Sequence, residues 1–130
     1  MSDKISQVEY WLKSAEHDLD AAEGLFRIGK FDWCLFLGHL VLEKVLKAAY
    51  ARNHSDLPPR THNLLLLAEK AGLKMTDEQK VFFGIVNDFN MESRYPDEKL
   101  SFYKLCTKSF TSDNFSKIKE YYKWLLKEMK

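Results

Sequence analysis

Residues 36–48 read FLGHLVLEKVLKA, and this stretch decides how the rest of the chain is interpreted. The apolar run extends over residues 31–51, at a density that predicts a largely buried helix. His39, Glu43 and Lys47 interrupt it at steps of four residues, so a helix places all three on one line. A buried polar group left unpaired costs about 1–3 kcal/mol. We therefore expect this line either to be a solvated edge or to face a second polar strip, in the same chain or in a second copy.

The sequence before and after this helix predicts further helices with clear ends. Apolar residues recur at helical spacing over residues 6–28, and Gly29 stands where a helix commonly ends. The connection to the central helix, which Asp32 would cap, is short enough to make the two helices antiparallel neighbours. Thr61 is expected to cap a short helix over residues 62–71.

Three signals organise the second half of the chain. Thr76 and Gln79 fit a capping box, which opens another helix. Pro96 disfavours helix at this point, and we expect the segment after it to be extended or loosely turned. Ser112 or Asp113 would then cap the final helix. Nothing alternates with the period-two rhythm of a strand. The predicted class is all-α: an up-and-down four-helix bundle with an additional short helix, in a single domain over residues 1–130.

The composition fits such a bundle. A chain of 130 residues with 45% hydrophobic and 30% charged residues is typical of a soluble globular domain with a sizeable core. The 20 Lys and Arg residues face 19 Asp and Glu residues, which leaves a formal net charge of +1. No overall positive field would hold nucleic acid, so any such binding must use a local patch.

Cysteine usage and the apolar stretches indicate the compartment. Cys34 and Cys106 fit no metal-binding spacing, and Cys34 is expected to be a reduced, buried thiol. The first residues, MSDKISQVEY, are too polar for a signal peptide, and the longest apolar stretch is too short to span a bilayer. We expect a cytoplasmic protein.

No motif demands a cofactor, a metal or enzyme chemistry. The sequence has no GxxxxGK[ST] or GxGxxG loop to hold phosphates and no HExxH pair. Its histidines are scattered over positions 17, 39, 54 and 62. We expect no cofactor and no metal site.

The segment RYPDEK, residues 94–99, holds the best partner for the polar line. Arg94 presents a rigid fork of donors that suits a carboxylate or a phosphate. It would either pair with Glu43 and hold the loop against the bundle or stay available for a phosphate. Tyr95 offers a ring and a hydroxyl, and Asp97 can fold back onto the nearby backbone or onto Arg94.

His62 is the other candidate, because it follows the expected cap residue Thr61. A ring at the start of a helix lies where backbone N–H groups favour anions, and Arg60 adds positive charge. His62 would therefore either face a phosphate or hydrogen-bond back to the preceding loop.

Three blocks of the chain together resemble a known family. They read WLKSAEHDLDAAEGLFRIGKFDWCLFLGHLVLEKVLKAAY, LPPRTHNLLLLAEKAG and RYPD, in that order. They are similar to the HEPN domain (higher eukaryotes and prokaryotes nucleotide-binding). The resemblance implies a helical bundle that forms a homodimer, with the long second helix near the shared face. It also implies a minimal nucleotidyltransferase as partner, in a two-component module of the toxin–antitoxin kind.

Some HEPN proteins are metal-independent ribonucleases, whose motif is an Arg followed four to six residues later by His. No histidine follows Arg94 at that distance, and Arg60 is too close to His62. Proton transfer to or from RNA needs such a group within reach. The prediction is therefore a non-enzymatic module. The alternative is a ribonuclease toxin in which Arg94 and His62 form an atypical catalytic pair.

The resemblance also implies a basic cleft that binds nucleotide or RNA. The expected cations are Lys44, Lys47, His62 and Arg94, and Tyr95 or Trp33 would stack on a base. A structural polar network of His39, Glu43 and Asp97 would lie beside this cleft. Surplus aromatic surface supports a homodimer, and its candidate residues are Trp33, Phe36, Tyr121, Tyr122 and Trp124.

Overall fold

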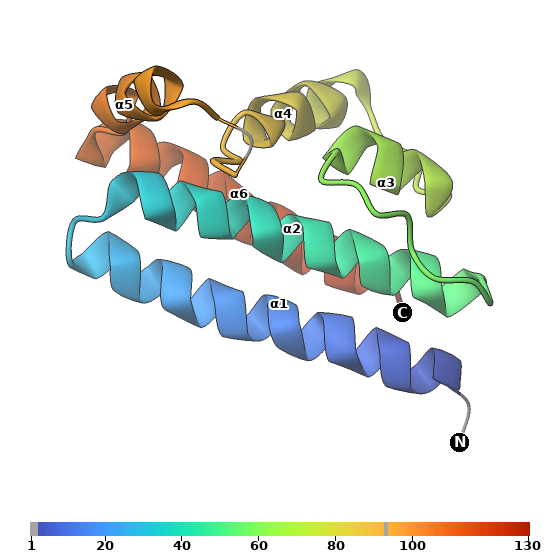
Figure 1. The fold of residues 1–130 in the computed structure, drawn as a ribbon. Coiled ribbons are helices and arrows are strands. Elements are labelled where there is room, and N and C mark those ends of the chain that lie inside the picture. The colour runs from blue at the N-terminus through green and yellow to red at the C-terminus, as the bar shows by residue number, and fades with distance from the viewer. Residues whose placement is uncertain (1–2, 93) are drawn as a thin grey trace.

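The computed structural model describes residues 3–92 and 94–130, with side chains from residue 6 onward, and these ranges contain helices and no strand (Figure 1). The predicted all-α class is confirmed. Three helices are long and three are short. In chain order they are α1 (Asp3–Arg27), α2 (Phe31–Asn53), α3 (Leu64–Lys70), α4 (Asp77–Asn87), α5 (Pro96–Leu105) and α6 (Lys108–Glu128). None of these helices is long and apolar enough to cross a membrane.

α1 and α2 form the antiparallel hairpin that the sequence predicts. Gly29 adopts φ +79°, a left-handed conformation that favours glycine. Its N–H donates to the carbonyl of Phe26 at 3.1 Å, and the N–H of Lys30 donates to Leu25 at 2.8 Å. These two bonds satisfy carbonyls at the end of α1 and reverse the chain within one turn.

α2 is the central helix, and the other five helices contact it. α1 and α6 cover it along its length, while α3, α4 and α5 lie across one side of the molecule (Figure 1). α6 packs closely against α2 at Gly38, where a Cβ would lie 2.8 Å from Cδ1 of Ile118. Only Trp33, Arg52 and Asn53 of α2 are exposed.

The segment after Pro96 is a helix, so the expectation of extended or loosely turned backbone is wrong. Pro96 occupies the first turn of α5, where a missing N–H costs nothing and a fixed φ suits the helix. The carboxylate of Glu98 accepts the backbone N–H of Tyr95 at 3.1 Å and closes this end. α6 also begins earlier than predicted, because Thr107 caps it by accepting the N–H of Phe110.

The capping box of Thr76 and Gln79 is present at the start of α4, as predicted. At α3 the expected cap is wrong by two residues. Asn63, not Thr61, accepts the N–H groups of the first turn, and Thr61 accepts the N–H of Asn63 at 3.1 Å. His62 therefore lies in the segment before α3 and not in its first turn.

A second amide fixes α3 against α4. The side-chain oxygen of Asn87 accepts the backbone N–H of Leu64 at 2.9 Å, and its NH2 group donates to Asn63 at 3.1 Å. The start of α3 and the end of α4 are thus held together, which fixes the position of His62 immediately before them.

Candidate functional site

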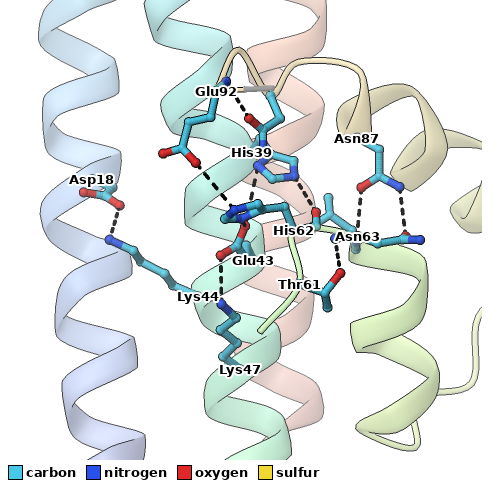
Figure 2. A network of polar contacts seen from close by, with 12 residues as sticks. Asp18, His39, Glu43, Lys44, Lys47, Thr61, His62, Asn63, Asn87 and Glu92 are labelled. Carbon is cyan, nitrogen blue, oxygen red and sulfur yellow. Dashed lines mark hydrogen bonds and ion pairs between the residues drawn. The ribbon is translucent and has the colours of Figure 1, made fainter. Parts of the chain in front are cut away.

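Glu43 is the centre of the polar cluster, in the middle of α2 (Figure 2). The residue is 4% exposed. Its Oε1 accepts Nδ1–H of His62 at 2.8 Å, and its Oε2 accepts Nζ–H of Lys47 at 3.0 Å. The polar line of α2 therefore faces a second polar strip of the same chain, the segment that precedes α3.

His39 completes the line one turn earlier and is fully buried. Its Nε2 lies 2.8 Å from the carbonyl oxygen of His62, to which it donates. In the neutral ring Nδ1 then carries a lone pair. This nitrogen lies 3.9 Å from Oε1 of Glu43 and has no hydrogen-bond partner. Burial lowers the pKa of His39, although the bond to His62 and the charge of Glu43 act the other way.

We expect this buried imidazole to make stability depend on pH. The pKa of His39 is below its ordinary value of 6.5 in the folded protein only, so below that pH the unfolded chain binds a proton that the folded chain does not. Stability should fall as pH drops from about 6.5, by at most about 1.4 kcal/mol per pH unit. Urea unfolding between pH 7.5 and 5.5 measures the slope. His39→Asn should flatten it, and an unchanged slope would contradict this account.

His62 bridges two carboxylates. Besides the bond from Nδ1 to Glu43, its Nε2 lies 3.5 Å from Oε2 of Glu92, a residue of the turn between α4 and α5 (Figure 2). The side chain is 53% exposed, so one edge of the ring meets solvent and the other meets the buried carboxylate. The ring thus joins α2, the segment before α3 and the turn after α4.

The two lysines of α2 turn to different neighbours. Lys47 contacts Glu43, and its Nζ lies 5.2 Å from the ring centroid of Trp11, a distance typical of a cation–π contact. Lys44 turns toward α1, where its Nζ lies 2.6 Å from Oδ2 of Asp18 and donates to Ser14 at 2.7 Å. The two lysines expected to line one cleft therefore belong to separate ion pairs.

Arg94 does not pair with Glu43, and this expectation is wrong. Its guanidinium donates to the backbone carbonyls of Asp88 and of Asn90, the latter at 3.2 Å. Its Cζ also lies 5.2 Å from the ring centroid of Phe102. The chain leaves α4 with carbonyls that no helical N–H can satisfy, and Arg94 is close enough in sequence to take them.

The remaining predicted residues lie outside the polar cluster. Asp97 is exposed in the first turn of α5. Its backbone carbonyl accepts a hydrogen bond from the Ser101 hydroxyl at 3.1 Å. Its expected place in a network with His39 and Glu43 is therefore wrong. Tyr95 is 74% exposed and Trp33 49% exposed, so both rings are open to solvent.

Arg94 lines an open pocket of about 680 Å³ between α4, α5 and the start of α6. Its apolar lining includes Phe89, Phe102 and Phe110, and Asp88 and Glu98 each add a carboxylate. Lys44, Lys47 and His62 are not among its lining residues. The four cations expected to form one cleft thus occupy three places: the α1–α2 interface, the Glu43 cluster and this pocket.

Sequence reasoning missed Glu92, Asp18 and Trp11. Asp18 had a usable signal, because Ser14 and Asp18 are four residues apart on α1, as a helix face that meets Lys44 requires. Glu92 had none, since it reaches His62 only through the turn after α4. Among the described residues, no three His, Cys, Asp or Glu side chains are grouped so as to hold a metal ion.

Cys34 and Cys106 are buried and free. Burial raises the pKa of each thiol to about 12, so both stay protonated at neutral pH. They belong to the packed core and not to a reactive site.

A family model of the HEPN domain matches residues 8–129, nearly the whole chain. No curated protein and no solved structure matches the chain.

Proposed function

The chain belongs to the HEPN domain family, and we propose that it is a non-enzymatic binding module of this family. It works as a homodimer with a minimal nucleotidyltransferase as protein partner, in a two-component system of the toxin–antitoxin kind. The position of His62 between Glu43 and Glu92 is the observation that supports the non-enzymatic part of this proposal. Membership of the family supports the dimer and the partner.

A ribonuclease would need a proton-transfer group that RNA can reach. A general acid or base must reach the 2′-hydroxyl or the leaving oxygen of RNA. The bond from Nδ1 of His62 to Glu43 is compatible with a catalytic ring, because a carboxylate commonly orients such a histidine. Its other nitrogen, Nε2, lies 3.5 Å from the carboxylate of Glu92, which repels an approaching phosphate. Arg94 is engaged by carbonyls of its own chain. Neither side chain of the alternative catalytic pair is arranged for phosphoryl transfer.

Nucleotide or RNA binding is the second candidate and is supported at one place only. Arg94 lines the pocket between α4 and α5, where its Nε and Nη2 donate to backbone carbonyls and Nη1 is left to hold a phosphate beside the carboxylates of Asp88 and Glu98. The exposed ring of Tyr95 lies next to Arg94 in the chain. A guanidinium and an open aromatic face are the groups that hold a phosphate and stack on a base. Lys44, Lys47 and His62 take no part in this reduced site.

We expect purified protein in EDTA to leave RNA intact. Decay should be no faster than in buffer and equal for the wild type, His62→Ala and Arg94→Ala, because none of these groups is set up for catalysis. Gel electrophoresis of a labelled RNA measures it. Decay that only the wild type supports would establish the ribonuclease and overturn the non-enzymatic reading.

Coexpression with the product of a neighbouring nucleotidyltransferase frame tests the other half of the proposal. The two proteins should elute together in size-exclusion chromatography. Separate elution, or the lack of any such frame beside this gene, would count against the two-component reading.

A further inference from the structure

The outer face of α5 carries two large apolar side chains that are open to solvent, Leu100 and Tyr103. Every residue of this helix except Phe102 is exposed. Leu100 and Tyr103 are 53% and 62% exposed and lie within one turn of each other. Leu100 is nearly opposite the buried Phe102, and Tyr103 lies beside Leu100 on the same exposed strip. In Figure 1 α5 lies at the outside of the molecule. Contiguous exposed apolar side chains mark interaction surfaces more often than chance.

α5 has little to hold it within one copy of the chain. Ten residues are too few for a stable helix in water. Among the described residues its attachment depends mainly on the buried ring of Phe102, which packs beside Phe89 with ring centroids 5.7 Å apart and lies 5.2 Å from Cζ of Arg94. A surface that packs on Leu100 and Tyr103 would add the apolar contact that the helix lacks.

The charges along α5 indicate which surface would pack on Leu100 and Tyr103. Asp97 lies in the first turn and Lys104 in the last. Their separation of seven residues makes nearly two turns, so both stand on the same flank of the Leu100–Tyr103 strip. A two-fold axis across two antiparallel α5 helices places Asp97 of each copy opposite Lys104 of the partner subunit. The helix is thus complementary to itself when reversed.

We propose that two copies of the chain meet through the outer faces of their α5 helices, antiparallel, with Leu100 and Tyr103 at the centre and two Asp97–Lys104 ion pairs at the edges. The inference rests on the homodimer of the proposed function but places the contact on α5. α2, which the family resemblance puts near the shared face, exposes only Trp33, Arg52 and Asn53. Of the other aromatic candidates, Phe36 is buried and Tyr121 stacks on Phe82 within the chain.

Charge reversal tests this arrangement by sedimentation equilibrium. Asp97→Lys and Lys104→Asp each set like charges against each other at both edges, so each variant alone should self-associate about tenfold more weakly than the wild type. An equimolar mixture restores both ion pairs, because one copy then carries two lysines and the other two acids. The mixture should return to wild-type association. Asp20→Lys, an exposed reversal on α1, should change nothing.

The outcomes separate this inference from the proposed homodimer. A dimeric wild type whose association neither reversal weakens, or whose weakened variants do not recover on mixing, would overturn the α5 contact and leave the dimer standing. A wild type that stays monomeric at hundreds of micromolar would overturn both. Circular dichroism confirms that each variant keeps its helices, and Leu100→Asp should weaken association without altering the edge charges.

Discussion

Replacing Glu43 with alanine is expected to lower the free energy of unfolding by about 3–5 kcal/mol, the range for removing one partner from a buried charged pair. The residue is 4% exposed and accepts from both Lys47 and His62. Its loss deprives Lys47, which is only 9% exposed, of its carboxylate partner. It also leaves a cavity beside α2. Urea unfolding at pH 7, followed by circular dichroism, measures the change.

Two further variants show whether burial is the cause. Glu69→Ala removes an exposed carboxylate from α3 and should change stability by less than about 0.5 kcal/mol. Glu43→Gln keeps the shape and one acceptor oxygen, so it should fall between the wild type and Glu43→Ala. A loss below about 1 kcal/mol for Glu43→Ala would show that the cluster does not stabilise the fold.

A leucine at Gly38 is expected to cost about 3 kcal/mol, at the upper end of the range for overpacking a core. Even a Cβ at this position would lie 2.8 Å from Cδ1 of Ile118, which is itself fully buried. The longer side chain would push α6 away from α2. Thermal and urea unfolding of Gly38→Leu, alone and combined with Ile118→Ala, measure the effect and its partial relief.

Gly84 provides the matched control, because it is also a helical glycine. An added Cβ there meets only Cδ1 of Leu65, at 4.0 Å. Gly84→Ala should stabilise the protein by about 0.5–1 kcal/mol through helix propensity, whereas Gly38→Ala should not. Equal stabilisation by both alanines would mean that α6 yields easily at this contact.

The sequence predicts the parts of this fold that depend on neighbouring residues. Gly29 and the Thr76–Gln79 box act within one turn of helix, and both are present as predicted. The expectation for the segment after Pro96 is wrong because proline both interrupts helices and starts them. The residue alone does not say which. What decides the matter at α5 is the bond from Tyr95 to Glu98, together with the buried ring of Phe102.

The candidate site was predictable along α2 and not across it. The Glu43–Lys47 pair follows from a spacing of four residues. The other partner of Glu43 depends on tertiary geometry: the sequence predicts Arg94 in this place, and the structure has His62 there. Asn63 caps α3 and is tied to Asn87, which brings His62 to the carboxylate. Arg94 binds the carbonyls that follow α4 instead.

The close approach of α6 to α2 also bears on how the chain reaches its native state. The α1–α2 hairpin joins residues that are near in sequence, and such local contacts form fast. The site at Gly38 must wait for Ile118, which is made much later on the ribosome. Until then the apolar face of α2 that α6 covers in the folded protein is exposed to solvent in the nascent chain. During this interval the protein is most prone to misassembly, because the exposed apolar surface that a chaperone can bind is then largest.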